Sequence, residues 1–295
     1  MKTPASPFES DDKSLWLPRD RREINSWARH YYATNPTIAT FIDEIANQVY
    51  SDFVIFGKDN TSKESVEKYR DEFLDGQCEF KFKKECIDLL IELNEIGEVT
   101  AYAELDEDKG NWSKLILHNP DYIEVRQNTL SSGIDLLLIP DEELKRLVDS
   151  KIKKDIEMVK SLDKEIVEYI KEGKSIPLNS RYASYFALKS SSYDIRGTSR
   201  IAKYFKILLH EDKLREESYE KNTPLPQTSE LNEAIRRVCV TKAFENSLKK
   251  QRNSLREWIE NKLFNPYGRI QNLKGSVGIL WNEEINMKSF EKMWK

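Results

Sequence analysis

The spacing of apolar residues changes at Gly97, and this change limits the possible folds more than any other feature of the sequence. The run before it, KKECIDLLIELNEIGE, carries apolar residues at helical spacing, and glycine is favoured just after a helix. From Glu98 to Pro140 apolar and polar residues alternate, interrupted by turn residues at Asp108–Gly110, Asn119–Pro120 and Ser132–Gly133. This region predicts three or four antiparallel strands, one beginning at Tyr122. Helices on either side of the strands predict an α+β fold.

Helical periodicity is found on both sides of the predicted strands. Pro36 begins a run whose apolar residues recur at three- and four-residue spacing, and a short strand is predicted at Phe53–Phe56. Further helices are predicted over 62–74, over 141–172 with a break near Lys160–Ser161, over 198–221 with Thr198 or Ser199 as N-cap, and over 230–263, ending before Asn265–Pro266. The tail after them predicts a short hairpin or strand and the start of a helix.

Charge and cysteine content exclude several classes of protein. The formal net charge is −4 and the pI is near 5.7, which argues against a protein that grips phosphates. Cys78, Cys86 and Cys239 are too few and too scattered for a disulfide framework, so we expect free, buried or half-buried thiols in a reducing compartment. No apolar run is long enough to span a membrane, so we expect no membrane partner.

Catalytic signatures are absent from the sequence. It contains neither a phosphate-binding glycine loop nor a nucleophile elbow, and none of its three histidines lies at metal-ligand spacing. The acidic clusters Asp106–Asp108 and Asp141–Glu143 are typical of a hairpin tip and a helix start. We therefore expect no catalytic residues, no metal, no cofactor and no enzyme. The alternative is a metal-dependent nuclease that uses scattered carboxylates, Asp106 and Asp108 among them.

Four stretches, taken in chain order, resemble the portal proteins of tailed bacteriophages, which are head–tail connectors. They are Tyr32–Ile55, with Asn-Pro before a helix; Leu93–Glu98, a helix ending in Gly-Glu before strands; Leu115–Val125, with a Pro-Asp turn; and Tyr193–Tyr219. In the last, Arg196, Gly197, Thr198 and Ser199 are similar to the start of the second stem helix, and DKLRE continues it. The run Gly173–Leu178 matches the approach through the clip. Together the matches cover about residues 15–225.

The resemblance implies a portal-like α+β fold with an α/β wing, a small β-containing clip and long stem helices. The expected parts are a flexible N-terminal arm over 1–14, the wing over 15–140, the first stem helix over 141–159, the clip over 160–196, the second stem helix over 197–222, and a returning helical wing and tunnel region over 223–295. We expect the helix at 198–221 to face a partner helix at 141–155. The chain departs from the family after the second stem helix, so the crown is expected to be short or absent and the C-terminal region incomplete.

The resemblance also implies a structural role in a virion, after assembly in the host cytoplasm. Portals form homo-oligomeric rings of about twelve copies at one capsid vertex, where double-stranded DNA passes without sequence specificity. They contact the major capsid protein, the terminase packaging motor and tail adaptor proteins. The candidate partner-binding residues in the clip are Lys171, Lys174, Arg181, Tyr182 and Tyr185, and the candidate DNA-channel residues are Lys203, Lys206 and Lys213. A capsid or tail adaptor outside the portal family is a further alternative.

Overall fold

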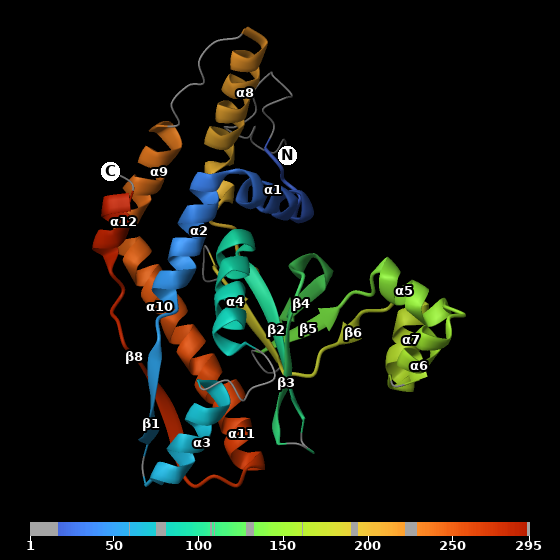
Figure 1. Ribbon diagram of the computed structural model, residues 1–295. Coiled ribbons are helices and arrows are strands. Elements are labelled where there is room, and N and C mark those ends of the chain that lie inside the picture. The colour runs from blue at the N-terminus through green and yellow to red at the C-terminus, as the bar shows by residue number, and fades with distance from the viewer. Residues whose placement is uncertain are drawn as a thin grey trace.

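Helices and strands alternate along the chain in the computed structural model (Figure 1). It describes residues 17–58, 60–74, 81–106, 108, 110–127, 133–160, 162–189, 194–221 and 229–293. The helices are α1 (Arg21–Thr34), α2 (Pro36–Val49), α3 (Lys63–Phe73), α4 (Phe82–Ile96), α5 (Glu142–Asp149), α6 (Lys153–Lys160), α7 (Lys164–Glu172), α8 (Phe205–Lys221), α9 (Ser229–Cys239), α10 (Lys242–Trp258), α11 (Asn265–Ile270) and α12 (Met287–Met293). The α+β class expected from the sequence is confirmed.

The strands form three small antiparallel sheets. They are β1 (Phe53–Lys58), β2 (Glu98–Asp106), β3 (Asn111–His118), β4 (Ile123–Gln127), β5 (Ile134–Leu138), β6 (Ile176–Pro177), β7 (Ala183–Ala187) and β8 (Ser276–Trp281). Their orders are β3-β2-β7, β4-β5-β6 and β1-β8. The alternation after Gly97 therefore produces four strands, as expected, although β4 begins at Ile123 rather than Tyr122.

Capping side chains fix several helix starts that the sequence predicts. The Asn35 side chain accepts hydrogen bonds from the N–H groups of Thr37 and Ile38 at the start of α2. Ser62 accepts from the N–H of Ser65 at the start of α3. At the end of α4, Gly97 has φ of 97°, a conformation that glycine adopts without steric cost.

One large hydrophobic core joins the two halves of the chain. Helices α2 and α4 pack side by side, and α10 packs against α2. The buried side chains of this core run from Ala28 to Phe290 in sequence. Strand β8 pairs with β1 in register from Phe53–Trp281 to Lys58–Ser276 (Figure 1). The residues after 229 therefore complete the core that α2 and α4 begin.

The helical region 141–172 has one more break than the sequence predicts. The break after Lys160 is present, but a second one at Ser150 separates α5 from α6. The Ser150 hydroxyl accepts from the N–H of Ile152 and donates to the Asp155 carboxylate. These local bonds compete with the helical hydrogen bonds, so the expected continuous first stem helix over 141–159 is wrong.

The block at 230–263 also differs from the prediction. It breaks at Thr241, whose hydroxyl caps α10 by accepting from the N–H of Phe244. The helix does not stop before Asn265–Pro266. A π-helical segment, η4 (Ile259–Phe264), leads directly into α11, where the missing N–H of Pro266 falls in the first turn. The tail forms a strand that pairs with β1 rather than a hairpin.

The long helix expected at 198–221 begins as a 3-10 turn. Segment η3 (Ala202–Tyr204) precedes α8. Of the apolar side chains at helical spacing here, Ile201, Phe205 and Leu208 are buried, while Leu209 is half-buried. Helices α8 and α5 lie at different ends of the molecule, so α8 does not face α5 within one chain (Figure 1). The expected arm over 1–14 and the linker at 222–228 lie outside the described residues.

Two further expectations concern thiols and membranes. Cys86 and Cys239 are free and buried, as expected, while Cys78 lies outside the described residues. Among the helices in the described part of the chain, none is long and apolar enough to cross a membrane.

Candidate functional site

Gly97 and Gly197 lie in contact although they are 100 positions apart in the sequence. They belong to two of the stretches that resemble portal motifs. A Cβ atom built on Gly197 would overlap the carbonyl oxygen of Gly97 and lie 2.9 Å from the Leu188 nitrogen. A Cβ built on Gly97 would likewise overlap the backbone of Thr198 and Ser199. The helix–Gly–Glu segment and the Arg-Gly-Thr-Ser segment therefore cross backbone to backbone. Only glycine permits this approach.

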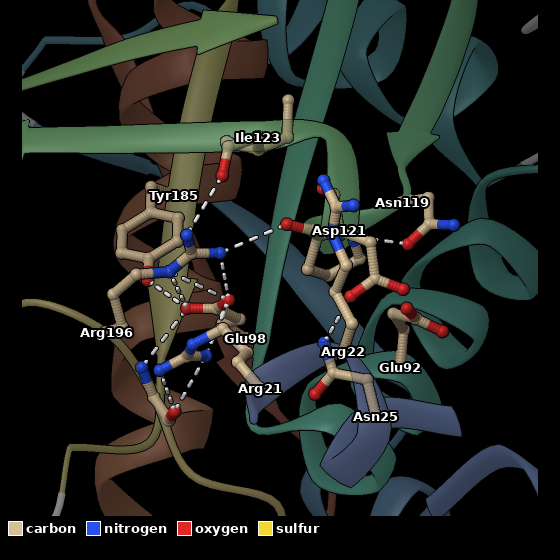
Figure 2. Close-up of polar contacts among 12 residues, drawn as sticks. Arg21, Arg22, Asn25, Glu92, Glu98, Asn119, Asp121, Ile123, Tyr185 and Arg196 are labelled. Carbon is tan, nitrogen blue, oxygen red and sulfur yellow. Dashed lines mark hydrogen bonds and ion pairs between the residues drawn. The ribbon is translucent and has the colours of Figure 1, made fainter. Parts of the chain in front are cut away.

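Glu98 is the centre of the polar cluster beside this crossing (Figure 2). Its side chain is fully buried in β2. Arg196 donates to both carboxylate oxygens, Arg21 donates to Oε1 at 2.9 Å, and the Gly197 N–H donates to Oε2 at 3.2 Å. The hydroxyl of Tyr185 donates to Oε2 at 2.5 Å. A buried carboxylate is thus paired and hydrogen-bonded on all sides, which offsets its desolvation.

The partners of Glu98 determine its ionisation. Burial by itself raises a carboxyl pKa, but the hydrogen bonds from Arg196 and Tyr185 and the charges of Arg196 and Arg21 outweigh burial and lower the pKa of Glu98. For Tyr185, burial and the neighbouring Glu98 charge raise the pKa of its hydroxyl. Glu98 is therefore a carboxylate and Tyr185 a neutral donor at neutral pH.

The Asn-Pro-Asp turn and helix α1 extend the cluster. Arg196 also donates to the carbonyls of Pro120 and Ile123, both at 3.0 Å. These bonds connect the Arg-Gly-Thr-Ser segment to the Asn-Pro-Asp turn. Asp121 accepts from Asn25 at 2.6 Å (Figure 2). It also accepts from Arg29 at 2.9 Å. Three of the four stretches that carry the portal resemblance therefore meet here. The remaining stretch, Tyr32–Ile55, begins within α1, and α1 supplies the partners Arg21, Asn25 and Arg29.

Ser199 and Arg200 connect the cluster to the C-terminal helices. The Ser199 hydroxyl donates to the Glu95 carbonyl and accepts from the N–H groups of Ile201 and Ala202, so Ser199 is the cap that the sequence predicts, while Thr198 is exposed. Arg200 donates to Asn94 Oδ1 and to the Ser247 hydroxyl of α10, both at 2.6 Å.

The five candidate clip residues do not form one surface. Lys171 and Lys174 lie exposed at the end of α7, and Lys174 pairs with Glu172. Arg181 and Tyr182 precede β7, with the guanidinium 5.5 Å from the Tyr182 ring centre. Tyr185 faces inward, bonded to Glu98, and therefore belongs to the cluster.

The three candidate channel lysines lie along η3 and α8. All three side chains are exposed. The ammonium of Lys203 lies 4.9 Å from the centre of the Tyr204 ring, and desolvation by surrounding protein atoms together with the Arg200 charge lowers the pKa of Lys203 to about 8. Lys203 therefore has a different environment from the other two.

The acidic residues of the nuclease alternative lie at the tip of the β2–β3 turn. Asp106 and Asp108 are held by the turn itself, since Asp106 accepts from the Asp108 N–H at 3.1 Å. Among the residues that the structure describes, no group of three or more His, Cys, Asp or Glu side chains could hold a metal ion.

Sequence reasoning did not find Glu98, Arg21 or Asp121. For Glu98 the strand pattern gave no signal, because Glu98 lies at the same alternate positions as Thr100, Tyr102 and Glu104, opposite the apolar face of the strand. Its burial follows from the segments that pack over the start of β2. Nothing in the sequence indicates that the partner is Arg196.

Glu95 provides a pH-dependent prediction at this site. Burial first, and the Glu92 charge second, raise the pKa of Glu95 to about 7, and Arg29 opposes them. Because an unfolded glutamate titrates near 4.3, the wild type loses stability as the pH rises from about 4 to 7. We expect Glu95→Gln to raise the free energy of unfolding by roughly 2 kcal/mol at pH 8 and to leave it unchanged at pH 4.

Urea denaturation at the two pH values measures this difference. Glu157→Gln, on the exposed surface of α6, makes the same chemical change and serves as the control. Equal effects of Glu95→Gln at both pH values would contradict the assignment.

The chain matches no model of a known protein family and no curated protein sequence.

Proposed function

We propose that this chain is a portal subunit, which forms a ring with other copies and serves as a structural conduit for a packaged viral genome. One observation carries the proposal: three of the four stretches that resemble portal motifs converge on one cluster, around Glu98 and the Gly97–Gly197 crossing. Separate chance resemblances have no reason to meet in space. A shared junction between wing and second stem helix explains why these segments occur together.

The helical lobe formed by α5, α6 and α7 supports an assembly of several copies. Neither α5 nor α6 contains a buried residue, and Ile152 and Met158 are 64% and 49% exposed. The lobe extends away from the main core (Figure 1). Apolar side chains exposed in this way are typical of contacts with other subunits.

The charge balance fits a conduit better than a DNA-gripping protein. A strongly basic channel would bind each phosphate and slow the passage of DNA, whereas a chain of net charge −4 leaves the backbone free to slide. In this proposal the ring resides at a capsid vertex of the virion. Its partners are double-stranded DNA, the major capsid protein, the terminase motor and tail adaptors, and its role is non-enzymatic.

Electron microscopy and native mass spectrometry of the purified protein test the proposal together. We expect rings with a central hole in the micrographs and one dominant oligomer of about twelve copies in the mass spectrum. The variant Ile152→Asp/Met158→Asp should reduce assembly, while Lys68→Gln, at an exposed position of α3, serves as a control for surface substitution. Monomers alone over a wide range of concentrations would overturn the proposal.

A further inference from the structure

A groove of about 1370 Å³ runs along the edge strand β7. Strand β7 pairs with β2 on one side only, because the sheet order is β3-β2-β7. All seven consecutive residues 183–189 line the groove. Successive side chains of a strand point to opposite faces, so a groove lined by every residue lies along the strand's edge.

The hydrogen-bond pattern shows which backbone groups face this edge. Leu188 N–H donates to the Gly97 carbonyl, and Tyr182 accepts from the Ala103 N–H, so the even-numbered residues of β7 bond to β2. The backbone groups of Tyr185 and Ala187 therefore point away from β2. Within the described part of the chain, their N–H and C=O groups have no partner in the structure.

Helix α10 forms one wall of the groove. Its residues Ser247, Lys250, Gln251, Ser254, Glu257 and Trp258 follow helical spacing, all line the groove, and carry one positive and one negative charge. Trp258 packs edge-on against Phe186 of β7, with ring centres 5.7 Å apart. Six of the groove's charged residues are cationic and two are acidic: Arg126, Lys189, Arg200, Lys203, Lys250 and Lys262 against Asp135 and Glu257.

This wall also carries buried hydrogen-bond donors that are not satisfied. Gln251 and Trp258 are each 5% exposed, and Gln251 Nε2 and Trp258 Nε1 have no partner among the described residues. A buried donor without a partner carries a free-energy penalty, but both atoms are enclosed by protein, so this penalty does not itself attract a ligand to the groove. The opposite wall, from sheet β4-β5-β6, includes the apolar residues Ile134, Leu136 and Leu178 together with the charged pair Arg126 and Asp135.

We propose that this groove binds an extended peptide segment of another protein by strand addition to β7. The peptide backbone bonds to Tyr185 and Ala187. Its side chains then alternate between the α10 side of the groove, where Lys250 and Lys262 lie, and the aliphatic side chains of β5 and Leu178. The segment that fits has acidic and aliphatic residues at alternate positions. Nucleic acid would match the cations, but it would leave the strand edge unpaired and the aliphatic side chains uncovered.

Fluorescence anisotropy with labelled decapeptides tests the proposal on the full-length protein. We expect a peptide that alternates glutamate and valine to bind at least tenfold more tightly than three competitors: its lysine–valine counterpart, a fully N-methylated version, and a ten-nucleotide oligothymidylate. The N-methylated peptide keeps its charge and loses its backbone donors. Lys250→Glu should weaken binding at least fivefold, while Lys249→Glu, on the same helix but outside the groove, should not.

Hydrogen exchange locates the bound peptide. We expect the amides of Tyr185 and Ala187 to gain protection when the glutamate–valine peptide is added. No binding of this peptide, equal binding of the N-methylated peptide, or tighter binding of the oligonucleotide would each overturn the proposal. Because binding is measured separately from ring formation, failure of one proposal leaves the other testable.

Discussion

Gly197→Ala is expected to lower the free energy of unfolding by at least about 3 kcal/mol, the upper range for overpacking a buried site. The added methyl group would overlap the Gly97 carbonyl oxygen, which is backbone and has no rotamer to move into. The two segments would have to separate, and the Gly197 N–H would then lose its bond to the buried Glu98 carboxylate. Chemical denaturation followed by circular dichroism measures the loss.

Gly173→Ala is the matched control for this substitution. Gly173 ends α7 with φ of 65°, and a Cβ built there meets no atom within 4 Å. The control therefore reports the cost of a Cβ atom in the left-handed region, about 1 kcal/mol, without any clash. Gly197 is not in that region, so the control sets a conservative limit for the comparison. If Gly197→Ala costs no more than Gly173→Ala, the close crossing of the two segments is contradicted.

Glu98→Gln is expected to destabilise the protein by about 3 kcal/mol, the size observed when one partner of a buried ion pair is removed. Glutamine keeps the shape of the side chain but removes the negative charge that Arg196 and Arg21 share. Its amide group would also point donor hydrogens at donors, since Arg196, Tyr185 and the Gly197 N–H all donate to this carboxylate.

The effect of Glu98→Gln should depend on pH. The pKa of Glu98 is lowered in the folded protein, so its contribution is fully present above the unfolded pKa of about 4.3 and is lost as the pH falls through the folded value. The difference between wild type and variant should be constant from pH 6 to 8 and smaller at pH 3. Glu142→Gln, at an exposed ion pair with Lys145, should have little effect throughout. A difference that does not change between pH 8 and pH 3 would contradict the paired carboxylate.

The two pH-dependent glutamates differ because of their partners. Glu95 and Glu98 are three residues apart, and both are buried. Glu98 has two arginines and two further donors, whereas Glu95 lies near the like charge of Glu92, with Arg29 as the opposing cation. Burial raises the pKa of both carboxyl groups, and only the arginine-rich surroundings of Glu98 reverse this effect.

Local chemistry was sufficient to predict most elements and several of their ends. The period change at Gly97 predicted the α4–β2 boundary, and Ser62 and Ser199 were among the predicted caps, because capping depends on residues within one turn, whereas the cap at Asn35 was missed. The breaks at Ser150 and Thr241 were missed. At each of these positions a hydroxyl group accepts a hydrogen bond from a nearby backbone N–H, which ends one helix and begins the next. The spacing of apolar residues along the sequence carries no information about such bonds.

The sequence by itself determined the α+β class, the buried thiols and the individual motifs, because these depend on spacing and residue type along a few turns of chain. Only the tertiary structure decided that Gly97 meets Gly197, that Glu98 pairs with Arg196 and Arg21, and that β7 presents a free edge beside α10. The residues in these contacts lie far apart in the sequence, as much as 100 positions in the case of Gly97 and Gly197. They arise from how the elements pack, so no local pattern encodes which partner each side chain meets.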